Sequence, residues 1–378
     1  MAKQISEADK LREETSIALK ELGTNIYNQI EQGEFPWVEM QSRSIDNIHY
    51  DETVRQYILG DRTIKRHSQN IKHIRPLTQL IWTAWFSREL VQSRKTSTLR
   101  EVYYSARGQR NIEYADQQES DGIITDLEVK MNKPRENFGI FPEERSAIFG
   151  DITIEYTVPG YEGRQTNLTD HPDGVMVGPA VTSSEFKKTS ANKVIVVEKG
   201  AMFTRLVEEQ AHKKFQAILI HTAGQSPRAT RNIIYRLNKD WHMPIYIFTD
   251  ADPWGVHIAQ VICSGSANAA HLRGLTTPNA KWMGVWASDI EDYKLPTENL
   301  TEFDSKRLTE LLKDPRYQQD PWNREIEKFI KLQKKAELEA LSTYGLTFFV
   351  DEYLPKKIAD AEKTAENKKK TDAKEDAD

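Results

Sequence analysis

The chain of 378 residues lacks several features that would assign it to familiar classes of protein. It contains a single cysteine, Cys263, which excludes a disulfide framework and a zinc site built from cysteines. No apolar run approaches the roughly 18–20 residues of a membrane-spanning helix, and the charged stretch Met1–Lys20 does not resemble a secretory signal peptide. The Gly-x-x-x-x-Gly-Lys-Ser/Thr motif that cradles the phosphates of ATP is also missing. We therefore expect a cytoplasmic protein that makes no contact with a membrane and binds no ATP itself.

Charge is distributed unevenly along the chain, although the net charge is only −5. The segment from Asp61 to Arg110 holds eleven basic and three acidic residues, so it carries +8 and the remainder carries −13. Such asymmetry is typical of a surface that binds a polyanion. The alternative is a solvated basic face without a ligand.

The first half of the chain predicts a helical unit followed by short strands. We expect an amphipathic helix at Met1–Glu34 within an N-terminal segment of residues 1–63, and then a winged-helix (CAP-like) domain over residues 64–150. Its two expected helices lie within Ile64–Gln92 and Leu99–Arg107, the second capped by the Thr-Ser-Thr sequence that precedes it. Three β-rich pieces predict wing or connecting strands: Ile123–Val129, Asp151–Thr157 and Val175–Val177. We expect residues 151–190 to form the connecting segment.

The second half alternates short apolar runs with helical stretches, which predicts a doubly wound parallel sheet over residues 191–355. The expected strands are Val194–Val197, Ala217–Ile220, Ile245–Phe248 and Trp282–Trp286. The expected helices are Met202–Lys214, Ala229–Leu237, Gly255–Ser264, Ser305–Lys313 and Trp322–Leu341. The tail, residues 356–378, has seven lysines, seven acidic residues and no aromatic residue, so we expect it to be disordered.

Three acidic residues follow the ends of two predicted strands. Glu198 comes after the first strand, and Asp250 and Asp252 come after the third. Open parallel sheets bind ligands at the carboxyl ends of their strands, and carboxylates beside a phosphate form a site for Mg²⁺. The sequence thus predicts a magnesium site, the alternative being that these acids only cap the helices that follow.

This pattern resembles a Toprim domain. The lone Glu198, the loop containing Gly224 and the sequence Asp250-Ala-Asp252-Pro-x-Gly255 are similar to the Toprim domain of the type IIB topoisomerase family, to which the meiotic double-strand-break protein also belongs. The sequence Leu-Arg-Glu-Val-Tyr-Tyr at residues 99–104 resembles that family's catalytic tyrosine motif. The resemblance covers roughly residues 64–354.

Helical phase favours Tyr104 over Tyr103 as the nucleophile. On a helix, Tyr103 joins the apolar stripe, whereas Tyr104 shares the opposite face with Arg100 and Arg107. A phenol has a pKa of about 10, so cations nearby favour its oxyanion. The family motif likewise puts the nucleophile at the second of the two aromatic positions.

The resemblance implies the cleaving component of an ATP-dependent topoisomerase, which forms a transient 5′-phosphotyrosyl link in each strand. It implies Mg²⁺ on Glu198, Asp250 and Asp252, and a homodimer in which the tyrosine of one protomer meets the metal of the other. It also implies a separate B subunit with a GHKL-type ATPase, giving an A2B2 assembly. We expect contacts with double-stranded DNA from six further basic residues: Arg94, Lys95, Arg110, Lys199, Arg228 and Arg231.

Three questions stay open at the level of sequence. The helix at Met1–Glu34 is either a docking element for the B subunit or a helix that packs on its own chain. A meiotic-type protein would break DNA without resealing it. A catalytically silent DNA-binding module is the third possibility, against which the intact tyrosine and carboxylate set argues.

Overall fold

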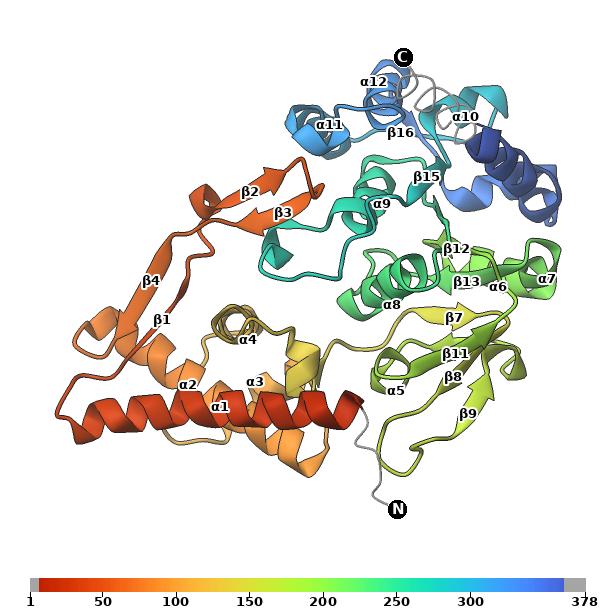
Figure 1. Cartoon of the computed structure of the whole chain (residues 1–378). Coiled ribbons are helices and arrows are strands. Elements are labelled where there is room, and N and C mark those ends of the chain that lie inside the picture. Colours follow the sequence, from red (N-terminus) through yellow and green to blue (C-terminus); the bar gives the residue numbers. More distant parts are fainter. Residues whose placement is uncertain (1–6, 364–378) are drawn as a thin grey trace, which may run out of the picture.

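Two large hydrophobic cores divide the computed structural model, which describes residues 7–363. One core comprises buried residues between Leu19 and Ile140, and the other comprises buried residues between Ile148 and Ala361. We call the corresponding parts the N-terminal unit, residues 7–141, and the C-terminal unit, residues 147–363 (Figure 1).

The N-terminal unit is mainly helical. Its helices and strands are α1 (Glu7–Glu31), β1 (Trp37–Gln41), β2 (Ile48–Asp51), β3 (Gln56–Leu59), β4 (Thr63–His67), α2 (Ile71–Ser93), β5 (Ser97–Thr98), α3 (Leu99–Arg107), α4 (Gln117–Met131) and β6 (Ile140–Phe141), with 3₁₀ turns at Ile45–Asn47 and Arg135–Phe138. α1 packs along α2, and α2 and α3 pack against α4. The paired strands β1 and β4 lead to the β2–β3 hairpin, which extends away from the helices toward the C-terminal unit (Figure 1).

The C-terminal unit contains more strands. Its elements are β7 (Ala147–Phe149), β8 (Ile152–Glu155), β9 (Gln165–Asn167), β10 (Val175–Met176), α5 (Pro179–Thr182), β11 (Glu185–Thr189), β12 (Lys193–Val197), α6 (Gly200–Glu208), α7 (Ala211–Lys214), β13 (Ala217–His221), α8 (Arg228–Lys239), β14 (Ile245–Phe248), α9 (Pro253–Ser264), β15 (Lys281–Gly284), α10 (Ala287–Asp292), β16 (Glu298–Asn299), α11 (Glu302–Lys313), α12 (Trp322–Leu332) and β17 (Lys334–Lys335). 3₁₀ turns occupy Leu168–Asp170, Ala267–Ala269, Pro315–Tyr317 and Leu338–Tyr344, and a π-helical turn at Phe349–Tyr353 continues as a helix over residues 354–363.

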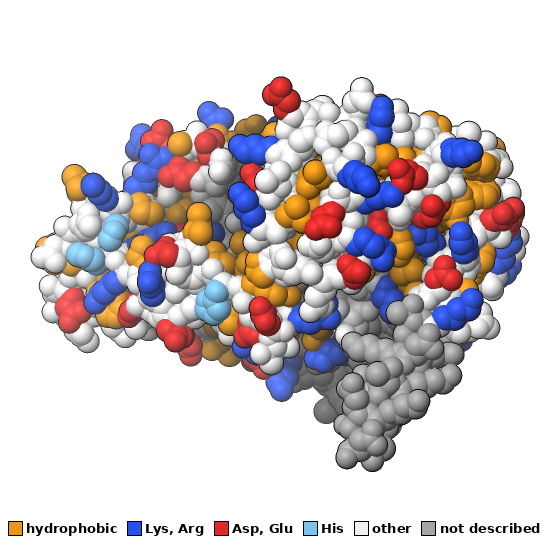
Figure 2. Space-filling view, turned by 90° about the horizontal axis from the view of Figure 1, so that it is seen from above, with side chains coloured by type: hydrophobic (Ala, Val, Ile, Leu, Met, Phe, Trp, Pro, Cys, Tyr) orange, Lys and Arg blue, Asp and Glu red, His pale blue; other side chains and the backbone are white. Residues whose placement is uncertain are grey.

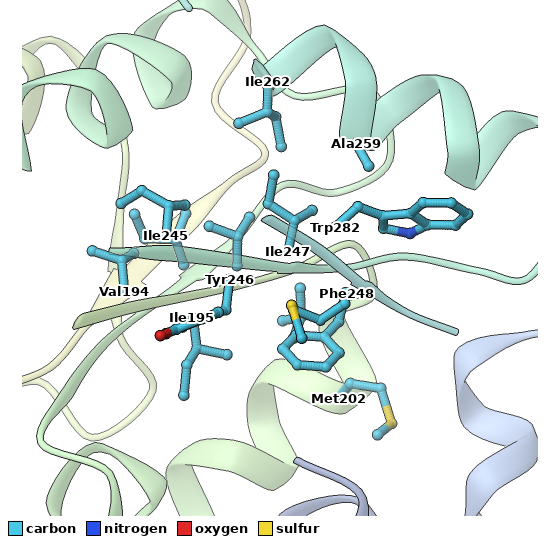
Figure 3. Close-up of a cluster of buried hydrophobic side chains, with 14 of the residues drawn as sticks. Val194, Ile195, Met202, Ile245, Tyr246, Ile247, Phe248, Ala259, Ile262 and Trp282 are labelled. Carbon is cyan, nitrogen blue, oxygen red and sulfur yellow. The ribbon is translucent and has the colours of Figure 1, made fainter. Parts of the chain in front are cut away.

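The central sheet has the strand order β10-β7-β13-β12-β14-β15. β13, β12, β14 and β15 are parallel, whereas β7 pairs with β13 in the antiparallel direction. Figure 3 shows Ala259 and Ile262 of α9 on one face of this sheet and Met202 of α6 on the other. Both faces are therefore covered, which explains why the strands have continuous apolar sequences. The doubly wound parallel sheet expected from the sequence is present, with antiparallel strands added at one edge.

Several expected elements differ from the structure. Ile123–Val129 is not a strand but part of α4, which begins at the N-cap Asp116. The helix is buried on several sides, so its apolar residues run continuously and imitate a buried strand. Residues 64–67, at the start of the stretch expected to be helical, lie in β4 instead, and α2 begins only after its N-cap Asn70.

Further differences concern where helices end. The helix expected at Met202–Lys214 is two helices, because Gln210 adopts a left-handed conformation with φ of 51° between α6 and α7. The helix expected at Trp322–Leu341 stops at Gln333, which is also left-handed. Residues 356–363 of the expected disordered tail are helical, with Ile358 and Ala361 buried in the core. Residues 364–378 lie outside the described residues.

The expected boundaries also shift at the connection. β7, from the end of the expected winged-helix range, and β10, from the expected connecting segment, belong to the central sheet. β8, β9 and β11 of the connecting segment form a separate three-stranded antiparallel sheet.

Candidate active site

The carboxyl edge of the central sheet brings acidic side chains together. Glu198 directly follows β12 and Asp250 follows β14, and these strands are hydrogen-bonded neighbours. The Glu198 Oε2 atom accepts a hydrogen bond of 3.1 Å from the backbone N–H of Asp250. Both side chains are buried. The topology thus places the two acids side by side although 52 residues separate them in sequence.

The electrostatics of this edge favour binding of a cation. Burial, together with the negative charges of Asp250 and Asp252, raises the pKa of Glu198 to about 7. Burial and the charge of Asp250 also raise the pKa of Asp252. The raised pKa values of Glu198 and Asp252 mark poorly compensated negative charge, which a divalent cation would neutralise.

Protein groups occupy several of the carboxylate oxygens. Asp250 accepts a hydrogen bond of 2.9 Å from the backbone N–H of Leu338 and forms a 2.9 Å ion pair with Lys199. Asp252 accepts a 2.6 Å hydrogen bond from Gly255 N–H as the N-cap of α9. Helix capping is therefore one real role of Asp252. Within residues 7–363, no three acidic, histidine or cysteine side chains are arranged as ligands of one metal ion.

Two further acids near the site were not expected. The ammonium of Lys199 also lies 3.3 Å from the carboxylate of Glu337, so it bridges Glu337 and Asp250. Burial raises the pKa of Glu339, and the negative charge of Asp250 adds to this shift. A bridge between Ala251 and Ala336 brings this segment to the sheet edge. No motif in the sequence marks it.

The tyrosine pair lies on α3 in the N-terminal unit. The Thr98 side chain and Glu101 form a reciprocal capping box that fixes the start of this nine-residue helix. Val102 is fully buried, Tyr103 is half-buried against the core, and Tyr104 is 53% exposed. The helical phase is therefore the one that the sequence predicted.

Arg100 and Arg107 lie beside different tyrosine rings. The Arg100 guanidinium lies 5.9 Å from the centre of the Tyr104 ring, as expected for neighbours four positions apart. Arg107 does not join them, because its guanidinium lies 5.7 Å from the Tyr103 ring, its own neighbour at four positions. Of the two cations expected beside Tyr104, the structure thus brings only Arg100 to that ring.

The basic segment is partly neutralised by acids from elsewhere in the chain. Arg94 pairs with Asp9 at 3.0 Å and with Glu162 at 3.5 Å. The other pairs are Arg62–Asp46, Arg66–Asp126 and Arg75–Glu119. Four exposed cations on or near α3 form no ion pair with any described residue: Lys95, Arg100, Arg107 and Arg110. On the face shown in Figure 2, basic and acidic side chains are intermixed.

Two of the arginines expected to contact DNA point inward. Arg228 at the start of α8 forms hydrogen bonds of 2.7 and 2.8 Å to both carboxylate oxygens of Glu128 in α4. Arg231 is 5% exposed, and burial beside Arg228 lowers its pKa to about 10. Neither guanidinium is presented to solvent, since both belong to the contact between the two units. Sequence could not reveal this, because Glu128 lies 100 residues from Arg228.

Comparison with known proteins gives consistent matches. The family model for the Toprim domain of topoisomerase 6 A subunits and Spo11 matches residues 193–358, and the family model "Type IIB DNA topoisomerase" matches residues 75–140. The chain is 45% identical over 344 residues to the A subunit of type 2 DNA topoisomerase 6 from Methanothermobacter thermautotrophicus, covering 90% of this chain and 96% of that relative. It is 36% identical to the protein of the same name from Archaeoglobus fulgidus, covering 89% and 94% of the two chains. No helix among the described residues is long and apolar enough to span a bilayer.

Proposed function

This chain belongs to the family of topoisomerase 6 A subunits and Spo11 proteins, the type IIB DNA topoisomerases, and on that premise we propose that it binds and cleaves duplex DNA as the A subunit of such an enzyme. One observation carries the proposal. An exposed tyrosine stands on a firmly capped helix in one unit, and a buried, poorly compensated set of acids lies at the edge of the parallel sheet in the other.

Tyr104 is the proposed nucleophile. Its oxygen attacks a backbone phosphorus, the 3′-oxygen of the neighbouring nucleotide leaves, and a 5′-phosphotyrosyl bond replaces the phosphodiester. The reverse attack by the 3′-hydroxyl reseals the strand without an external energy source, because one phosphodiester is exchanged for another. Arg100 beside the ring would stabilise the tyrosine oxyanion and the charge that develops on the phosphate. Arg107 would contact the phosphate from the neighbouring position.

Glu198, Asp250 and Asp252 are the residues that would hold Mg²⁺. The chemistry of the donor set fits a hard divalent cation, since it consists of carboxylates in which burial and neighbouring negative charge raise the pKa of Glu198 and of Asp252; their oxygens would have to move to coordinate one ion together. Lys199 already places a positive charge against Asp250, and it would have to release that oxygen when the metal binds. When bound, the ion supplies electrostatic stabilisation of a phosphate oxygen.

The finer features of DNA binding follow from the N-terminal unit. We assign a winged-helix DNA-cleavage domain to residues 64–150, of which residues 75–140 match the type IIB topoisomerase model, because α2 and the tyrosine helix α3 both pack against α4. Lys95 and Arg110, exposed beside α3, are suited to contact phosphates next to the cleavage point. One tyrosine cuts one strand, so a double-strand break requires a homodimer.

ATP would be hydrolysed by a separate GHKL-type B subunit, giving an A2B2 assembly. α1 is a candidate docking element for it. The helix buries Leu19 and Ile26 against the N-terminal core, but its Tyr27 remains 59% exposed beside Trp85 of α2. These two rings border a groove of about 440 Å³ between α1 and α2. α1 therefore packs on its own chain and still leaves an apolar surface for a partner.

The test compares the chain alone with the chain plus a B subunit. Purified chain with Mg²⁺ should bind duplex DNA as a dimer but should not hydrolyse ATP, and relaxation of supercoils should appear only once the B subunit is added. Robust ATP-dependent relaxation by the chain alone would overturn the two-subunit proposal. Breaks that persist in the presence of both subunits would favour a break-forming protein that does not reseal DNA.

A further inference from the structure

The contact between the two units is polar and partly hollow. The large hydrophobic cores do not merge across it. A cavity of about 590 Å³ lies between the units, bordered by Leu90 and Asn137 on one side and by Pro179 and Asn232 on the other. Interfaces of this kind permit relative motion of domains unless specific contacts restrain them.

A buried cluster centred on Glu128 is one such contact. Glu128 is fully buried in α4 and accepts hydrogen bonds from Arg228 of α8. Its Oε2 atom also lies 3.2 Å from Nε2 of His271, in the segment between α9 and β15. The backbone N–H of Arg135 donates a further 2.8 Å hydrogen bond to Oε1. One carboxylate thus connects the N-terminal unit to two elements of the C-terminal unit.

The charges around this carboxylate keep it ionised. Although burial raises its pKa, the His271 hydrogen bond and the charges of Arg228 and Arg135 lower the pKa of Glu128 to about 2. Removing one member of such a buried pair leaves the other charge without compensation, which is far more costly than losing a surface ion pair. The cluster therefore favours one relative position of the units strongly over others.

Three further hydrogen bonds between the units lie at the periphery. The β2–β3 hairpin reaches the C-terminal unit, where Gln56 accepts a 2.9 Å hydrogen bond from Thr276 and Tyr57 donates a 3.4 Å one to Asp314 (Figure 1). Near the start of α1, Arg12 donates a 3.3 Å hydrogen bond to the carbonyl oxygen of Thr157. These groups are less buried than Glu128, so they restrain the units less.

From this arrangement we infer that Glu128 is a positioning residue for DNA cleavage: through Arg228 and His271 it fixes the tyrosine-bearing unit relative to the unit that carries the acidic edge. α4 packs directly against α3, so a shift of α4 moves the tyrosine helix. The inference rests on the proposed role of Tyr104 and on the proposed homodimer, in which the tyrosine of one protomer meets the acidic edge of the other, so the relative position of the units within each protomer sets both approaches. A misplacement of about 1 Å at a reacting group is sufficient to slow a reaction on the order of a hundredfold.

The test replaces Glu128 with glutamine and uses Asp126→Asn as a matched control. Asp126 lies on the same helix and is also buried, but its ion pairs with Arg43 and Arg66 stay within the N-terminal unit. Both substitutions should lower the unfolding temperature. Only Glu128→Gln should also broaden the distance between the units and reduce covalent protein–DNA adducts by roughly tenfold or more, with DNA affinity unchanged.

The distance is measured by pulsed electron spin resonance between labels on Gln92→Cys in α2 and Lys213→Cys in α7, both exposed positions. The native Cys263 is buried and does not compete for the label. Arg228→Gln removes the same contact from the opposite unit and should give the same broadening. If Glu128→Gln does not fold, this variant decides the question.

Three outcomes are informative. Broadening in Glu128→Gln and Arg228→Gln but not in Asp126→Asn supports the inference. An unchanged distance distribution in both, or equal broadening in the control, overturns it. If the unsubstituted protein forms no adduct at all, the proposed function fails, whereas the distance measurement still decides whether Glu128 holds the units together.

Discussion

Exchanging the hydroxyl of Tyr104 for hydrogen should separate chemistry from folding more cleanly than any other change in this chain. Tyr104 is 53% exposed, and its hydroxyl forms no hydrogen bond with a described residue. Its ring neighbours are Tyr103, with ring centres 5.2 Å apart, and the Arg100 guanidinium at 5.9 Å. A phenylalanine keeps both contacts, so Tyr104→Phe should change the free energy of unfolding by no more than about 0.5 kcal/mol.

The effect on cleavage should be total, because phenylalanine has no oxygen to attack phosphorus. The assay traps covalent protein–DNA adducts with denaturant after incubation with Mg²⁺, and filter binding on the same samples checks that DNA affinity is retained. Tyr103→Phe is the matched control. Its half-buried ring stays in place, and a small displacement of α3 that raises the activation free energy by about 0.5 kcal/mol would lower the cleavage rate only about twofold. Adducts formed by Tyr104→Phe, together with an inactive Tyr103→Phe, would refute the assignment of the nucleophile.

Five more substitutions test the other charged groups. Glu198→Ala and Asp250→Ala should each suppress cleavage in Mg²⁺. Since the pKa of Glu198 is about 7 and a metal binds the carboxylate form, calorimetric Mg²⁺ affinity should fall by about tenfold per pH unit below 7 in the unsubstituted protein. Arg100→Ala should reduce the cleavage rate at least about tenfold more than Arg107→Ala, because only Arg100 lies over the Tyr104 ring; equal losses would contradict this. The pKa of Glu128, about 2 when folded and near 4.5 when unfolded, implies about 3 kcal/mol of stability that is present above pH 4.5 and lost as the pH falls toward 2. Denaturant unfolding at several pH values should show the deficit of Glu128→Gln shrinking over that range.

The sequence predicted the central sheet because its strands leave a local signal. A strand covered on both faces, such as Ile245–Phe248, must be apolar at every position, and that requirement is visible in four residues. The same pattern gave a wrong strand prediction at Ile123–Val129, since a helix buried on several sides is also apolar at successive positions. The breaks within helices could not be predicted from the sequence, because a non-glycine residue such as Gln210 gives no indication that it adopts the left-handed conformation.

The position of the acidic edge could be predicted because it depends on strands that the sequence indicates. Glu198 and Asp250 follow recognisable strands, and the topology of parallel sheets determines where strand ends meet. The Leu338 N–H that donates to Asp250, by contrast, belongs to a later segment that crosses the site after a bridge at Ala336. Contacts between distant segments of this kind have no local sequence signal.

Counting charges along the sequence likewise does not show how many cations are free to contact DNA, and this number can be measured. The eleven cations between Asp61 and Arg110 would give a slope of about −10 in log binding constant against log salt if each neutralised one DNA phosphate. Four of them pair with acids outside that segment, and four exposed ones near α3 have no such partner among the described residues. If those four alone contact phosphates, the slope should be about −4 per chain. Fluorescence titrations of a short duplex between low and moderate salt measure it directly. A slope near −10 would mean that DNA displaces the acidic partners, and the ion pairs around the tyrosine helix would then be exchanged for phosphate contacts on binding.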